Sequence, residues 1–185
     1  MCDNKLEKQF KVFTSSQDVD LVNSNDTKKL FEELSYRCIL PSSGTIIEKS
    51  IYDEIGNFND YVYVEDWSLH LRVTRMGIKM HILPIVTNYH RDGGISHGNT
   101  RGNERIYIQF CKDLLTLYEK EVQPYTSIMT DEAAAKSKQA YEKEKRKLEE
   151  YIKSCEHTSK PDKKEGKRTI SIKLKECFTR LVKRN

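Results

Sequence analysis

The sequence predicts a mixed α/β fold (α+β in its element order) followed by appended C-terminal helices. Within the first 122 residues, short strand-like stretches stand between short amphipathic segments. Beyond residue 122 the chain is rich in Lys and Glu and has the residue spacing of helices. The strand-like stretches do not alternate strictly with helices and are too few for a complete doubly wound sheet. We therefore expect a partial α/β domain over 1–122, a helical extension over 123–159 and a basic amphipathic tail over 160–185.

The elements before residue 65 are predicted from local patterns. Residues 4–13, NKLEKQFKVF, place Leu6, Phe10 and Phe13 on one face, which predicts a helix. Residues 18–22, DVDLV, predict a short strand. The remaining expectations here are a turn at 23–26, a short helix or structured loop at 27–35, extended chain at 37–47, a short helix at 48–56 ended by Gly56, and extended chain at 61–64.

The later elements are predicted in the same way. A helix is expected over 65–76, ended by Gly77, with Asp66, Leu69 and Val73 on one face. It is followed by a strand-like stretch at 78–90, a Gly-rich loop at 91–103, a helix at 104–121, a break at Pro124, a charged helix at 131–156 and a final helix at 169–183.

Composition limits where this chain works. The 185 residues include five cysteines without a CxxC pair, which indicates a reduced, cytoplasmic setting. No apolar run reaches the roughly 18 residues of a membrane span, and the first residues do not form a signal peptide. The tail over 160–185 holds ten Lys/Arg and three Asp/Glu, a net charge of +7, so the other residues hold 22 against 25, a net charge of −3. The tail therefore needs its own explanation.

Two adjacent acids, Glu65 and Asp66, begin the helix expected at 65–76, next to the only tryptophan, Trp67. One interpretation is structural: acids in a first helical turn are stabilised by the helix dipole. The other is functional, because Tyr61 and Tyr63 add aromatic faces of the kind that suit polyhydroxylated ligands. A carboxylate at a cleft edge can accept a proton from a sugar hydroxyl as a general base.

Four segments in order resemble glycosyltransferase family 2. SSGTIIEKSIYDEIGNFND (42–60) precedes the Glu-Asp pair, LHLRVTRMG (69–77) follows it, and YHRDGGIS (89–96) comes next. The stretch NKLEKQFKVF also resembles the family's helix after its metal-binding DxD. The resemblance covers about residues 4–122. It implies part of an A-type glycosyltransferase fold, in which a sugar passes from a nucleotide-sugar to an acceptor hydroxyl with a divalent metal, Mn²⁺ or Mg²⁺.

The resemblance also implies roles for particular residues. Asp66 is the expected catalytic base, Glu65 helps to position the acceptor or donor sugar, and Trp67 is a wall of the acceptor site. Arg72 matches a structural arginine of the family's helix. His90 is a candidate metal ligand, or an ordinary strand residue. The residues expected to face the donor diphosphate are Arg91, Gly93, Gly94 and Ser96.

The family's nucleotide-binding half, which ends in DxD, is not found ahead of these segments. Asp18 and Asp20 have DxD spacing, but they lie within a predicted strand and are interpreted as surface acids. The chain is therefore expected to be weakly active or inactive alone. The alternatives are a non-catalytic remnant, a subunit that completes a separately encoded donor half, or a basic membrane-surface module. Exposed apolar surface would favour self-association or a partner chain.

Other patterns complete the expectations. The histidines and cysteines show no zinc spacing. Residues 169–183 predict a basic amphipathic helix that suits the inner face of an anionic membrane. The alternatives are a helix docked on the body and a disordered tail. The sequence does not interleave aromatic and basic residues in the way that nucleic-acid-binding proteins do, so nucleic acid is not expected as a partner. A sugar or lipid-linked acceptor and the sugar donor are the partners that the resemblance implies.

Overall fold

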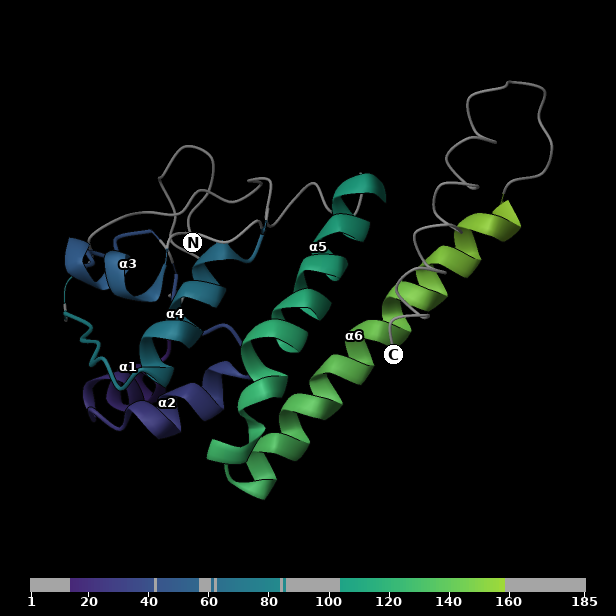
Figure 1. The fold of residues 1–185 in the computed structure, drawn as a ribbon. Coiled ribbons are helices and arrows are strands. Elements are labelled where there is room, and N and C mark those ends of the chain that lie inside the picture. The colour runs from purple at the N-terminus through teal and green to yellow at the C-terminus, as the bar shows by residue number, and fades with distance from the viewer. Residues whose placement is uncertain are drawn as a thin grey trace. The chain divides into compact units, whose positions relative to one another are not determined.

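The computed structural model describes residues 14–41, 43–56, 61, 63–83, 85 and 104–158 (Figure 1). Within these ranges the ordered elements are all helical, and there is no β-strand. The α/β prediction, including a partial A-type glycosyltransferase fold, is therefore wrong for the described residues. The helices are α1 (Ser16–Asn23), α2 (Thr27–Leu34), α3 (Lys49–Ile55), α4 (Glu65–Arg75), α5 (Glu104–Leu117) and α6 (Asp131–Thr158), with a π-helical turn, η1 (Tyr118–Val122), and a 3-10 turn, η2 (Gln123–Ile128).

Helix α1 replaces the strand expected at 18–22. Ser15 and Asp18 form a capping box, in which the Asp18 amide donates to Ser15 Oγ at 3.2 Å and the Ser15 amide donates to Asp18 Oδ2 at 3.3 Å. A capping box satisfies two backbone donors at a helix start, so it outweighs the strand preference of the valines. Asp18 is buried and pairs with Arg37 at 2.6 Å, whereas Asp20 is exposed. The surface interpretation therefore holds for Asp20 alone.

Residues 78–83, the described start of the strand expected at 78–90, are irregular. A strand needs a neighbour for its backbone groups. Here the side chain of Asn23 takes that place at Ile82: its amide donates to the Ile82 carbonyl at 3.1 Å, and its oxygen accepts from the Ile82 N–H at 2.8 Å. Extended chain is thus held by a side chain of α1, without a sheet.

The helices expected at 48–56, 65–76 and 131–156 are confirmed with ends within two residues. Of the two alternatives at 27–35, a short helix or a structured loop, the structure shows the helix, and the helix expected at 104–121 ends as an α-helix at Leu117 and continues as η1. Gly56 and Gly77 follow α3 and α4 with φ of +80° and +76°. Glycine adopts this backbone region without the steric cost of a Cβ, which explains both helix ends. The expected elements at 4–13, 91–103 and 169–183 lie outside the described residues.

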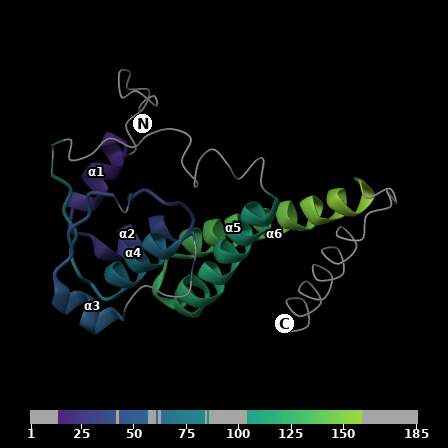
Figure 2. The same cartoon turned by 90° about the horizontal axis from the view of Figure 1, so that it is seen from above.

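The hydrophobic core lies where α4 packs against α2, and these two helices are neighbours in both views (Figures 1 and 2). Phe31 and Leu34 of α2 and Leu71 of α4 are almost completely buried. Extended chain contributes Ile39 and Leu40, and Val122 of η1 joins the same cluster. Helix α4 is therefore packed against α2 and η1.

The chain divides into two compact units, residues 1–145 and 146–185. Helix α5 continues into η1 and then η2, where Pro124 lacks the N–H that an α-helix would use. Within the first unit, the early part of α6 packs on η1: the rings of Tyr118 and Tyr141 stack at 4.5 Å. Among the described helices, none combines the length and the apolar character needed to cross a bilayer.

Candidate functional site

The acids expected at the site begin α4 as predicted. Glu65 and Asp66 occupy its first turn, and the preceding residue, Val64, makes no side-chain cap. Asp66 Oδ1 accepts a hydrogen bond from the Trp67 N–H at 2.7 Å. Asp66 is half-buried, so its carboxylate lies at the edge of the folded unit, where the positive end of the helix dipole favours negative charge.

One carboxylate oxygen of Glu65 is a hydrogen-bond acceptor to which no described residue donates. The atom is Oε2, which is buried and has no hydrogen-bond partner among the described residues. A buried carboxylate oxygen without a partner costs free energy, because water no longer solvates it. Because this oxygen is shut off from solvent, a hydroxyl or N–H of another molecule reaches it only when the start of α4 opens.

Trp67 serves the fold. Its indole N–H donates to the Leu34 carbonyl, at the C-terminal end of α2, at 2.6 Å. The ring is partly buried and packs against the hydrophobic core. Its described contacts thus fix α4 on α2, beside the acids. They are contacts within the fold, and they do not test the role of Trp67 as a wall of the acceptor site, which the resemblance implies.

A buried polar network supports α4 from behind. Arg72 Nη1 donates to the carbonyls of Ile55 and Gly56 at 2.8 and 3.1 Å, which joins α4 to the end of α3. Glu121 of η1 accepts from Ser68 Oγ at 3.2 Å and pairs with Arg75 at the same distance. These contacts agree with the structural role expected for Arg72.

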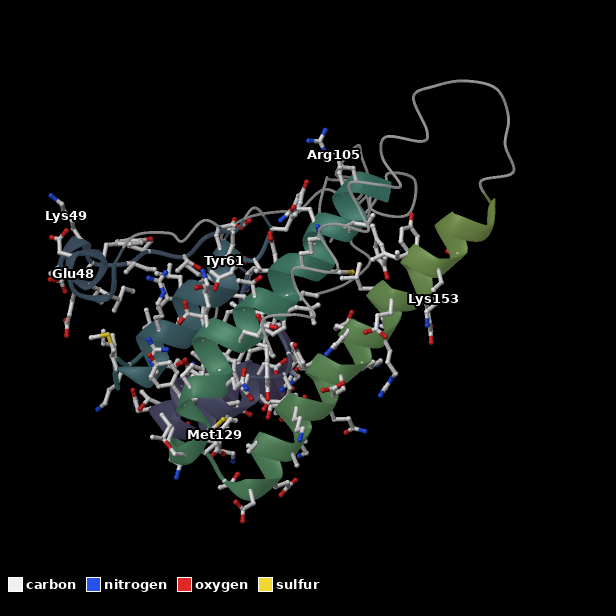
Figure 3. The ribbon with its side chains drawn as sticks, turned by 45° about the vertical axis from the view of Figure 1, so that its right-hand side comes forward. Glu48, Lys49, Tyr61, Arg105, Met129 and Lys153 are labelled. Atoms are coloured by element: carbon white, nitrogen blue, oxygen red, sulfur yellow. The ribbon has the colours of Figure 1, made fainter. Side chains whose placement is uncertain are left out.

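The chain that enters α4 is fixed as well. The Tyr63 N–H donates to Asp113 Oδ2 of α5 at 3.0 Å. Tyr61 lies in the interior, while Glu48, which precedes α3, and Lys49, the first residue of α3, are exposed (Figure 3). Burial raises the pKa of Tyr61 to about 12, with Glu121 adding to the shift. The Tyr61 hydroxyl is therefore neutral at pH 7. The hydrogen bond from Tyr63 to Asp113 fixes the chain just before α4.

The charge of Asp66 contributes to the pKa shifts of two further groups, Cys38 and His70. Desolvation raises the pKa of the Cys38 thiol to about 12, and Asp66 adds to this rise. Cys38 as a residue is nevertheless exposed, so this shift is not evidence of an inert thiol. Burial lowers the pKa of His70 from 6.5 to about 4, against a smaller opposing effect of Asp66. His70 is therefore neutral at pH 7.

The buried His70 predicts an acid-sensitive fold. The unfolded chain protonates this imidazole near its ordinary pKa of 6.5, whereas the folded chain does so only near 4. Stability from this group is complete above the unfolded pKa and falls as the pH decreases through this window, by about 3 kcal/mol in all. Urea unfolding at successive pH values measures this loss in the free energy of unfolding.

A matched pair of variants isolates the effect. His70→Phe removes the titrating group and should flatten the profile between pH 6.5 and 4, while His81→Phe, at an exposed position, should keep it. An unchanged slope in the His70 variant would rule out His70 as the source.

The other expected site residues cannot be placed. His90, Arg91, Gly93, Gly94 and Ser96 lie outside the described residues. In the described ranges, no group of three or more His, Cys, Asp or Glu side chains could hold a metal ion. The part of the expected site that the structure shows is therefore the acid pair at α4.

The sequence analysis did not identify three polar residues whose hydrogen bonds hold α4 and the chain before it: Ser68, Asp113 and Glu121. Asp113 and Glu121 lie on helical stretches but are only about 5% exposed, and Ser68 is fully buried. The signal that could have found them is an acid at a position where the helix periodicity places apolar residues. Their partners lie about 50 residues away in sequence, which no local pattern reveals.

Comparison with family models, with curated proteins and with solved structures finds no match to this chain.

Proposed function

We propose that this chain binds the acceptor sugar of a glycosyl-transfer reaction at the N-terminal end of α4. In this proposal Asp66 is the general base that takes the proton of the attacking hydroxyl, and Glu65 orients the sugar. The observation that carries it is the Glu65–Asp66 pair: Glu65 Oε2 is a buried acceptor that lacks a donor in the described residues, and the half-buried Asp66 stands next to it.

The chemistry of the pair fits this task. Carboxylate oxygens accept hydrogen bonds from hydroxyl groups, and charge-assisted bonds of this type are stronger than neutral ones. A base must lie within hydrogen-bond reach of the proton that it removes. Two adjacent carboxylates on one rigid helix start can hold two hydroxyls of a sugar, so that one is positioned while the other reacts.

The remaining parts of the proposal rest on the sequence resemblance. A nucleotide-sugar would be the donor, and a divalent metal, Mn²⁺ or Mg²⁺, would stabilise the charge of the leaving diphosphate, with His90 as the ligand that the resemblance implies. The reaction belongs to polysaccharide or glycolipid biosynthesis. Residues 169–183 hold the chain on the inner face of an anionic membrane, which sedimentation with anionic and neutral vesicles would test.

Titration with simple sugars tests acceptor binding. A panel of methyl glycosides is added to the full chain and followed by amide resonances in NMR spectra. We expect selective shifts at the amides of Glu65, Asp66 and Trp67, because the sugar hydroxyls meet the acid pair. Glu65→Gln should weaken the response by about tenfold, since a charged acceptor is lost.

Asp20→Asn is the matched control. Asp20 is an exposed acid on α1, remote in sequence from the pair, so this variant should bind sugars as the wild type does. Shifts that are absent for every sugar of the panel, or that are equal in Glu65→Gln and the wild type, would contradict acceptor binding at α4.

A further inference from the structure

A cavity of about 420 Å³ lies on another side of α4. Its walls come from Thr14, from the end of α1, from residues 40, 41, 43–48 and 51, from α4 and from residues 78–83 and 85. This volume falls within the range of roughly 300–1,000 Å³ typical of small-molecule sites. Glu65 and Asp66 are not among its lining residues, so it is separate from the acid pair.

The inner wall is aliphatic. Val22, Leu40 and Val73 are buried there, and no Phe, Tyr or Trp side chain is among the lining residues that the structure describes. At the cavity, Ile46, Leu83 and Ile85 are strongly exposed, at 97%, 59% and 64%. Large apolar side chains in water around an apolar cavity indicate a surface that gains from contact with an apolar molecule.

One polar group stands in this wall. His70 lines the cavity and is only 1% exposed. Its Nδ1 atom is buried and has no hydrogen-bond partner among the described residues. A buried ring nitrogen without a hydrogen-bond partner is costly, so Nδ1 beside an aliphatic wall suits a hydrogen bond to a group that enters the cavity.

We propose that this cavity binds an aliphatic alcohol, with the alkyl chain against the isoleucine, leucine and valine walls and the hydroxyl on the His70 imidazole. The hydroxyl suits a neutral imidazole in either tautomer, because it both donates and accepts. A charged headgroup does not fit, since no buried ion partner lines the inner wall. A sugar fits less well, because the polar lining residues Ser43, Thr45, Glu48 and Lys79 are exposed, whereas His70 is buried with the aliphatic wall. This inference does not depend on the proposed function.

The probe is 1-octanol, titrated into the full chain at pH 7 and followed by amide resonances. Octanol should shift the amides of cavity residues such as Val22, Leu40, Val73 and Ile82, and leave those of Glu65 and Asp66 unchanged. His70→Leu keeps the wall apolar but leaves the alcohol hydroxyl unpaired, so octanol should bind about tenfold more weakly.

Two further variants keep the test decisive. Ile51→Trp adds bulk at a partly buried lining position and should abolish the octanol shifts even if His70→Leu does not fold. Asp20→Asn changes an exposed residue that does not line the cavity and should bind octanol within about twofold of the wild type. Octanol without effect on cavity amides would overturn the proposal. So would equal octanol affinity in His70→Leu and the wild type, which would mean that the hydroxyl is not recognised and that His70 meets only water.

Discussion

Replacing Asp66 with asparagine is expected to lower the rate of sugar transfer by about 10²–10⁴-fold, the usual contribution of a positioned general base. An asparagine side chain has nearly the same shape, and its oxygen can still accept the hydrogen bond that Asp66 Oδ1 takes from the Trp67 N–H. It cannot take a proton from an acceptor hydroxyl. The start of α4 should therefore persist while the chemistry is lost.

The measurement is transfer of radiolabelled sugar from a panel of nucleotide-sugars, with Mn²⁺ and the acceptor sugar that binds best. Asp20→Asn controls for the loss of one exposed negative charge and should transfer at the wild-type rate. Thermal unfolding of both variants checks that the fold is kept. Because the chain alone is expected to be weakly active, the assay is followed to low turnover, and equal rates in Asp66→Asn and the wild type would contradict the assignment of Asp66.

Arg72→Leu is expected to destabilise the fold by roughly 3–5 kcal/mol, the cost of breaking a buried charged network on one side. Arg72 is 6% exposed and holds the carbonyls of Ile55 and Gly56, and its Nε lies 4.0 Å from Glu121 Oε1. Removing the guanidinium leaves two carbonyls without this donor and weakens the compensation of the buried Glu121 carboxylate. The free energy of unfolding in urea is the quantity to measure.

A second variant separates charge from packing. If the buried carboxylate causes part of the loss, then Arg72→Leu with Glu121→Leu should recover part of it, since both charged partners are then apolar. Arg75 is partly exposed and also stacks over the ring of Tyr125 at 3.7 Å, so it keeps a partner in the double variant. A loss below about 1 kcal/mol in Arg72→Leu would show that the network is not important for stability.

The helices with strong periodicity and clear ends were predictable. For α4, the spacing of Leu69 and Val73 and the position of Gly77 were sufficient, because the side chains bury one face and the glycine takes the backbone conformation that ends the helix. The strands were not predictable. Residues 18–22 have the valines of a strand, but the capping box of Ser15 and Asp18 selects a helix. Residues 78–83 have no neighbouring strand in the described residues, so their extended preference gives no sheet.

The candidate site was predictable only in part. The sequence placed Glu65 and Asp66 correctly in the first turn of α4, because both acids and helix periodicity are local features. It could not show that Trp67 bonds to Leu34, 33 residues earlier, or that Glu65 keeps a buried oxygen without a donor. No local pattern marks His70, and only the packing of distant segments reveals that it lines a cavity.

The central claim is that Glu65 and Asp66 receive sugar hydroxyls, and the most direct test compares one sugar with and without its hydroxyl donors. The best-binding methyl glycoside and its per-O-methylated derivative are each titrated into the full chain, and the amides of Glu65, Asp66 and Trp67 are followed. The account predicts selective shifts with the free sugar and none with the methylated one, since ether oxygens cannot donate to a carboxylate. Equal shifts with both sugars, or shifts with neither, would contradict it.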